Sequence, residues 1–264
     1  MSIDLAYTDA GAGPVVVLLH AFPFDRRMWD GQIDALSGEH RVIAVDLRGF
    51  GDSALVDSAL GEDAPNLDEM ADDVAALLDR LSIPQAVVAG LSLGGYVTMA
   101  LVRRHARLVS AVMLLDTKAT ADGDAAANNR ERIAATVESD GSVEVLMTDV
   151  VPALTGSTTK AERPDVVARI ESLVAEAAPA AVAWTQRAMA KRPDSVPTLE
   201  EFERPSLVVV GDEDVLAPLA EAHIMFDALA EPVLAVIPGC GHLSALERPD
   251  DVTAIMLDFL DDLR

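Results

Sequence analysis

A serine stands between two glycines in the segment Gly90-Leu91-Ser92-Leu93-Gly94. The apolar run Val87-Val88-Ala89 precedes it and a helix-compatible stretch follows it, a context typical of a sharp strand-to-helix turn that exposes a nucleophilic serine. The flanking glycines leave room for such a turn because they carry no Cβ. The following helix would aim its N-terminal amides at the Ser92 hydroxyl. A five-residue motif can also arise by chance, so this hypothesis requires a base, an acid and a second amide donor elsewhere in the chain.

A serine hydroxyl is a weak nucleophile unless an imidazole accepts its proton and a carboxylate orients that imidazole. We predict His242 as the base, because it follows the last buried apolar run in the glycine-rich loop Pro238-Gly239-Cys240-Gly241. His20 ends an earlier run, and for it we favour a structural role in holding its loop. The remaining histidines, His40, His105 and His223, have no comparable setting.

The acid has two main candidates, since Asp116 and Asp214 each follow a buried apolar run, and the neighbours Asp212 and Glu213 compete with Asp214. We favour Asp214 and keep Asp116 as the alternative. Cys240 is interpreted as a small buried residue, because it has no better claim on His242 than Ser92 has. Asp46 and Arg48 are interpreted as partners that fix their own loop.

The elements that must position these residues follow an alternating pattern of strands and helices. Continuous apolar runs predict buried strands at residues 14–19, 41–46, 84–91, 108–115, 205–210 and 233–237, and a weak alternation predicts an edge strand at 3–7. Helical spacing appears at residues 26–36, 67–81, 220–229 and 249–263. This pattern predicts an α/β fold with a mostly parallel sheet flanked by helices. The candidate residues all lie at carboxyl ends of strands, where open α/β sheets place their sites.

Residues 118–203 interrupt this alternation with helical segments broken by prolines and glycines. We predict a helical cap at 118–203, inserted into a core formed by 1–117 and 204–264, because the alternation resumes directly afterwards. The apolar residues of the cap are interpreted as its own core, and one or two of them could line an acyl pocket: Met147, Leu154, Leu173, Trp184 and Met189.

Composition limits the partners. The chain has 264 residues and a formal charge of −24, so nucleic acid and anionic membrane surfaces are poor partners. One cysteine excludes an internal disulfide, and neither a signal peptide nor a membrane span is apparent. We therefore expect a cytoplasmic protein that acts on a small molecule, and the oligomeric state stays open.

Taken together, the motifs resemble those of the α/β-hydrolase superfamily. They comprise His20-Ala21-Phe22-Pro23, the segment 46–53, the Ser92 turn, Gly211-Asp212-Glu213-Asp214 with Pro218, and Gly241-His242 with Glu247-Arg248-Pro249. The resemblance covers essentially the whole chain and implies the α/β-hydrolase fold. It assigns Ser92 as nucleophile, Asp214 as acid, His242 as base, and the backbone amides of Phe22 and Leu93 as the oxyanion hole. Ala21 is a departure, since many members have glycine there.

The resemblance implies a serine esterase or lactonase that cleaves small carboxylic esters or lactones through an acyl-Ser92 intermediate, without metal or organic cofactor. Arg27-Met28-Trp29-Asp30 and the cap are distantly similar to 3-oxoadipate enol-lactonases. Enol-lactone hydrolysis, carbon–carbon bond hydrolysis and cofactor-free perhydrolysis would use the same residues. A small-molecule receptor with a retained triad is the alternative of another class.

An enol-lactone with a free carboxylate would require a local cation, because the net charge of the chain repels anions. The arginines of the predicted cap are candidates for this cation: Arg130, Arg132, Arg163, Arg169 and Arg187.

Overall fold

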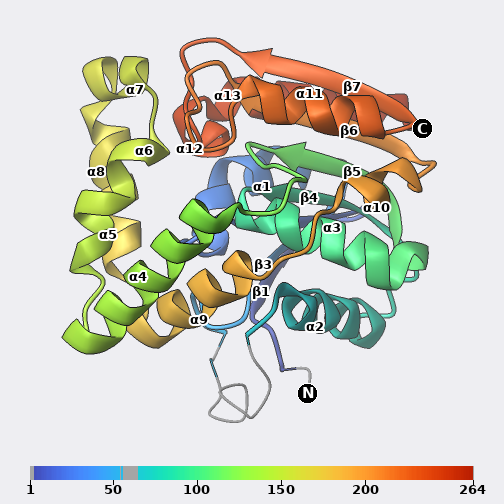
Figure 1. Ribbon diagram of the computed structural model, residues 1–264. Coiled ribbons are helices and arrows are strands. Elements are labelled where there is room, and N and C mark those ends of the chain that lie inside the picture. Colours follow the sequence, from blue (N-terminus) through green and yellow to red (C-terminus); the bar gives the residue numbers. More distant parts are fainter. Residues whose placement is uncertain (1–2, 54, 56–64, 264) are drawn as a thin grey trace.

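The computed structural model describes residues 3–53, 55 and 65–263, and within them a seven-stranded sheet forms the centre of the molecule (Figure 1). The strands lie in the order β1-β3-β2-β4-β5-β6-β7. Their bounds are β1 (Tyr7–Ala10), β2 (Val15–Leu19), β3 (Arg41–Val45), β4 (Ala86–Leu91), β5 (Val109–Leu115), β6 (Pro205–Gly211) and β7 (Glu231–Ile237). Only β1 is antiparallel to its neighbour within this sheet. The predicted fold class, an α/β-hydrolase fold with a mostly parallel sheet, is confirmed.

The four central strands are buried over almost their whole length because helices cover both faces of the sheet (Figure 1). Val16, Val112 and Val208, one each from three of these strands, have no exposed surface. Strands buried on both faces require continuous branched aliphatic runs, which is why the sequence shows no polar alternation here.

The predicted N-terminal edge strand was placed too early. We expected it at residues 3–7, but β1 spans Tyr7–Ala10 and pairs Tyr7 with Val45 of β3. The residues before β1 are held by side chains instead: the Ile3 amide donates to Asp73 Oδ1 at 2.8 Å, and the Ala6 amide donates to Ser53 Oγ at 2.8 Å. An edge strand is half exposed, so its ladder pairing accepts polar residues that a hydrophobicity pattern does not predict.

Helices flank the sheet and contact one another or its strands. Helix α1 (Asp30–Leu36), which follows the short 3-10 helix η1 (Arg26–Trp29), contacts α13 (Pro249–Asp262). Helix α2 (Leu67–Arg80) contacts α3 (Leu93–His105), and α11 (Leu219–Ala228) contacts β6 and β7. Two further short helices among the described residues are η3 (Ala106–Leu108) and α12 (Ser244–Glu247). Helix α2 begins where the Asn66 side chain accepts a hydrogen bond from the Glu69 amide, a typical N-cap.

The segment between β5 and β6 is helical. It contains α4 (Asp124–Asp140), α5 (Glu144–Asp149), α6 (Val151–Leu154), α7 (Ser157–Glu162), α8 (Pro164–Ala175), α9 (Pro179–Ala190) and α10 (Val196–Glu200). Figure 1 shows α4 to α9 gathered at one side of the sheet, and α4 contacts α9. Helix α10 contacts α3 and α11, which lie outside the segment between β5 and β6. The division into a core and a cap at 118–203 stays a prediction.

Of the apolar residues that we interpreted as the core of the cap, Leu154, Leu173, Trp184 and Met189 are buried and Met147 is half-buried. Within residues 3–53 and 65–263, no helix combines the length and the apolar character that crossing a bilayer requires.

Candidate active site

Ser92 occupies the turn between β4 and α3 in a strained backbone conformation. Its φ is +54°, which an L residue rarely adopts and which costs about 1–3 kcal/mol. A Cβ on Gly90 would collide with the Gly94 carbonyl, and a Cβ on Gly94 would collide with the Leu19 carbonyl of the neighbouring strand. The two glycines of the motif are therefore required by close backbone packing, and this packing holds Ser92 in its conformation.

Ser92, His242 and Asp214 form a continuous hydrogen-bonded chain, although they are far apart in the sequence. His242 Nε2 lies 2.8 Å from Ser92 Oγ, and His242 Nδ1 lies 2.8 Å from Asp214 Oδ2. The other carboxylate oxygen of Asp214 accepts hydrogen bonds from the amides of Leu216 at 2.8 Å and Ala217 at 3.0 Å. The structure thus brings the three predicted residues together and fixes the orientation of the carboxylate.

The charges of His242 and Asp214 suit proton transfer from Ser92. Burial alone would lower the pKa of His242, but the adjacent Asp214 charge and its hydrogen bond outweigh burial and raise this pKa above its ordinary value. Burial would raise the pKa of Asp214, but the His242 charge and hydrogen bond lower it, so the carboxylate stays ionised. This arrangement can accept the Ser92 proton and stabilise the resulting imidazolium.

The Leu93 amide is the first of helix α3, and Phe22 follows strand β2, which pairs with β4 beside the Ser92 turn. Among the described residues, neither the Phe22 nor the Leu93 amide donates a hydrogen bond to another group. Both amides stay predicted donors of the oxyanion hole.

His20 holds the loop that carries Phe22. Its Nδ1 contacts the Ala21 carbonyl at 2.8 Å, and its Nε2 accepts a hydrogen bond from the Leu47 amide at 2.9 Å. Burial lowers the pKa of His20, which keeps the ring neutral. These contacts agree with the structural role that we favoured.

The loop after β3 is fixed by Asp46 and Arg48. Asp46 accepts hydrogen bonds from the Arg26 amide at 2.8 Å and the Asp52 amide at 2.9 Å. Arg48 is buried, and its guanidinium binds both carboxylate oxygens of Asp73 on α2, at 2.8 and 3.0 Å. Both residues therefore stabilise structure near the site, as the sequence suggested.

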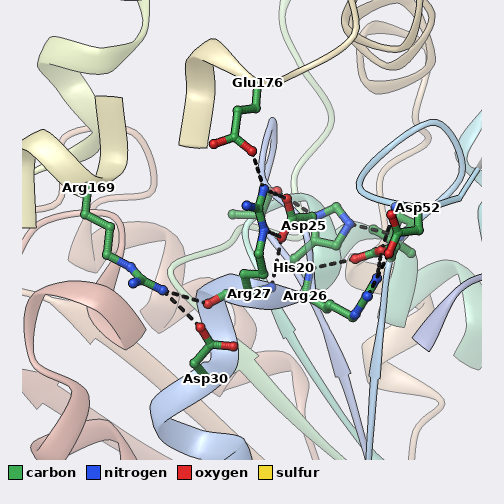
Figure 2. Close-up of polar contacts among 11 residues, drawn as sticks. His20, Asp25, Arg26, Arg27, Asp30, Asp52, Arg169 and Glu176 are labelled. Atoms are coloured by element: carbon green, nitrogen blue, oxygen red, sulfur yellow. Dashed lines mark hydrogen bonds and ion pairs between the residues drawn. The ribbon is translucent and has the colours of Figure 1, made fainter. Parts of the chain in front are cut away.

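Ion pairs connect this region to the segment between β5 and β6. Figure 2 shows Arg27 between Asp25 and Glu176, and Arg169 reaching toward Asp30. Arg27 Nη2 lies 2.7 Å from Glu176 Oε2, and Arg169 Nη2 lies 3.1 Å from the Arg27 carbonyl oxygen. The helix η1 that follows the Phe22 loop is thus tied to α8.

Asp116, the alternative acid, makes different contacts. Its carboxylate accepts hydrogen bonds from the Gly211 amide at 3.1 Å and the Ser244 amide at 3.0 Å, and in the part of the chain that the structure describes it makes none with His242. Burial and the nearby Asp214 charge raise the pKa of Asp116 to about 7. Asp116 therefore links the loop that carries Asp214 to the loop that carries His242, and the hydrogen-bond geometry favours Asp214 as the partner of His242.

Glu247 has a structural role that the sequence reasoning missed. Its buried carboxylate accepts hydrogen bonds from the amides of Gly156, Gly241 and Leu243, at 2.9 to 3.1 Å. It thereby fixes the loop that carries His242. Its place in the Glu247-Arg248-Pro249 motif was the only sequence signal. Cys240 in the same loop is buried, and burial raises the pKa of its thiol, which opposes a nucleophilic role.

A cavity of about 300 Å³ opens beside Ser92 and His242. Its apolar lining includes Ile133, Leu154 and Met189 from the helices between β5 and β6, so two of the predicted acyl-pocket candidates are in place. A second cavity of about 340 Å³ lies between Phe24 and Leu173. Ser92, His242 and Asp214 are not among the residues that line it. Among the described residues, no group of three or more His, Cys, Asp or Glu side chains is arranged to hold a metal ion.

The sequence and the fold are similar to those of known proteins. The profile of the Alpha/beta hydrolase family matches residues 16–255. A thermophilic esterase from Thermogutta terrifontis, solved with malate bound, is 36% identical, with a TM-score of 0.93 over 98% of this chain and 94% of the esterase. An enol-lactonase from Burkholderia xenovorans is 28% identical, with a TM-score of 0.87 over 97% of this chain and 96% of the lactonase. A putative non-heme chloroperoxidase from Synechocystis is 29% identical over 98% of this chain and 95% of its own length.

The sheet topology, the serine turn and these matches define a hydrolase class of enzyme. The chain belongs to the alpha/beta hydrolase family.

Proposed function

We propose that the protein is a serine hydrolase that cleaves small carboxylic esters or lactones through an acyl-Ser92 intermediate. The observation that carries this proposal is the Ser92–His242–Asp214 hydrogen-bonded chain, which opens directly onto the cavity of about 300 Å³. The names of the esterase and enol-lactonase relatives support the same class of reaction.

In the first half-reaction, Ser92 Oγ attacks the ester carbonyl while His242 Nε2 accepts the hydroxyl proton. The amides of Phe22 and Leu93 stabilise the oxyanion of the tetrahedral intermediate. The intermediate then expels the alcohol, which takes its proton from His242, and the acyl group remains on Ser92. For a lactone, the alcohol stays attached to the acyl group.

In the second half-reaction, His242 removes a proton from water, and the resulting hydroxide attacks the acyl-Ser92 carbonyl. The collapse of this second intermediate releases the carboxylic acid and returns the proton to Ser92. Hydrogen peroxide in place of water would give a peracid, and the similarity to a putative chloroperoxidase is a reason to test this perhydrolysis.

The testing experiment is a burst and steady-state assay with short 4-nitrophenyl esters and a panel of lactones, run beside Ser92→Ala. Multiple turnovers that disappear in the variant would establish the serine hydrolase, and the panel would choose between esters and lactones. The malate in the structure of the related esterase is a reason to include carboxylate-bearing esters. A Ser92-dependent fluorophosphonate label without turnover would favour the small-molecule receptor instead.

A further inference from the structure

Two cations line the cavity beside Ser92, although the whole chain carries a charge of −24. Lys118, which follows β5, and Arg130, on α4, both line this cavity. A carboxylate approaching the protein is repelled by the net charge at long range, so cations on the cavity wall are significant for ligand choice.

Two carboxylates also line the cavity, and each of them pairs with a cation that lies outside the lining. Asp122 is contacted by three cations: Lys118 Nζ lies 3.4 Å and Arg192 Nη1 2.8 Å from its Oδ1, while Arg130 Nε binds its Oδ2. The second carboxylate of the lining, Asp149, pairs with one further cation, Arg132. Arg132 and Arg192 do not line the cavity, but their charges offset those of Asp149 and Asp122, so these two carboxylates do not fully neutralise Lys118 and Arg130.

Asp122 holds these cations without using up their donors. Its side chain is fully buried, and although burial would raise its pKa, the charges of Arg130 and Arg192 lower it, so it stays ionised. Within the described residues, Lys118 Nζ makes only the 3.4 Å ion-pair contact, and Arg130 Nη2 donates no hydrogen bond. Both side chains keep about one-fifth of their surface exposed, at 19% and 20%. Donors of two fixed cations are thus available at the cavity.

We propose that Lys118 and Arg130 form a carboxylate-binding subsite, and that the preferred substrates are esters or lactones that carry an additional ionised acid group. A charge-assisted hydrogen bond to a carboxylate is stronger than a neutral one, and two cations can share one carboxylate. The apolar side chains of Ile133, Leu154 and Leu216 line the same cavity and suit the methylene chain that separates the acid from the ester. This inference rests on the proposed ester or lactone hydrolysis at Ser92.

The test compares substrates that differ only in one charge. Monomethyl adipate and methyl hexanoate share a chain and a scissile ester, and the amide of monomethyl adipate is a neutral polar control. Monomethyl succinate and glutarate vary the distance between acid and ester. Turnover is followed by titration of the released acid. The quantity compared is the ratio of kcat/KM for an acid-bearing ester to that of its neutral counterpart.

We expect this ratio to fall about tenfold in Lys118→Met, Arg130→Met or their combination, the effect of losing a hydrogen bond to a charged group. Arg187→Met is the matched control: it removes one cation from α9, where Arg187 pairs with Glu131 and Glu138 and does not line the cavity. In this control the ratio should not change. In the unmodified protein, about 1 M NaCl should lower the ratio by screening the subsite, which tests the inference without any variant.

A second measurement covers the case in which methyl esters are not turned over. Adipate should protect Ser92 from a fluorophosphonate probe more strongly than adipamide does, and the combined variant should lose this difference. Equal protection by the two compounds, or a kcat/KM ratio that is the same in the combined variant and the unmodified protein, would overturn the subsite. Turnover that persists in Ser92→Ala would instead overturn the proposed function, so the two failures are distinguishable.

Discussion

Replacement of Asp214 by asparagine should abolish most turnover, because it moves the imidazole proton of His242 from Nδ1 to Nε2. The carboxylate accepts a hydrogen bond from His242 Nδ1 at 2.8 Å, and its other oxygen accepts those of Leu216 and Ala217. An asparagine that kept its oxygen on these two amides would point its NH2 group at Nδ1. His242 would then accept at Nδ1 and carry its proton on Nε2, which faces Ser92 Oγ and must be unprotonated to act as a base.

The magnitude follows from this change of tautomer. In a Ser–His–Asp arrangement, the wrong tautomer lowers kcat by about 10⁴-fold. This loss corresponds to about 5.5 kcal/mol of transition-state stabilisation. Asp116→Asn is the matched comparison, because Asp116 is also buried nearby but binds the amides of Gly211 and Ser244 instead of the imidazole. Its effect on kcat should stay within about tenfold, the equivalent of one pKa unit on His242.

The pH profile gives a second readout. In the unmodified enzyme, kcat/KM should fall as pH drops through the raised pKa of His242, since the free enzyme then loses its neutral base. Without the Asp214 charge, burial dominates and lowers the pKa of His242, so in Asp214→Asn the acid limb should move to lower pH. Thermal melts of both variants would test whether they fold. A loss of kcat in Asp116→Asn as large as that in Asp214→Asn would contradict these roles, and so would an Asp214→Asn variant that keeps more than about a tenth of the kcat of the unmodified enzyme.

Three further predictions concern stability. Gly94→Ala should destabilise the fold by about 1–3 kcal/mol or more, because the new Cβ would collide with a backbone carbonyl. In the control Gly123→Ala, no atom of the described residues lies within 4 Å of the new Cβ, so the melting temperature should change little. Equal losses of stability for the two variants in urea unfolding would contradict this prediction. Arg48→Met should lower the free energy of unfolding by about 3–5 kcal/mol, because it leaves the buried Asp73 carboxylate without its ion pair. A second substitution, Asp73→Leu, should recover part of this loss. If the losses in the double variant are additive instead, the two side chains do not stabilise the fold as a pair. The pKa of Asp116 is about 7 in the folded protein but about 4 in the unfolded chain, so the folded state binds more protons between these pH values. The free energy of unfolding should therefore fall as pH rises from about 4 to about 7, by at most about 1.4 kcal/mol per pH unit. Asp116→Asn should remove this pH dependence, which denaturation measured across the range would show.

The sheet and the position of the site could be predicted from the sequence because both depend on the same feature. Strands buried on both faces need continuous apolar runs, and the residue that ends each run lies at the carboxyl edge of a parallel sheet. Ser92, Asp214 and His242 each follow such a run, so their meeting follows from topology without knowledge of individual contacts.

The roles of Asp116 and Glu247 could not be predicted in this way. Both carboxylates accept hydrogen bonds from backbone amides in loops that are distant in sequence, and these contacts exist only after the strand ends assemble. The sequence could therefore propose Asp116 as an acid, but it could not show that its oxygens are occupied by Gly211 and Ser244. The early placement of the edge strand before Tyr7 has a similar cause, since its hydrogen bonds depend on pairing with β3 and not on apolar periodicity.

The cations that line the cavity could have been predicted more fully from the sequence. Of the five arginines that we considered as partners of a substrate carboxylate, only Arg130 lines the cavity among the described residues, and Lys118 was not considered. The helical period explains the selection: Ala126, Asn129, Arg130 and Ile133 all line the cavity and stand at positions i, i+3, i+4 and i+7 of α4. Arg132 is off this face and pairs with Asp149. The apolar Ile133 thus marks the inward face of the helix, so a charged residue three positions before it belongs to the cavity wall, whereas a neighbouring charge outside the period belongs to the surface.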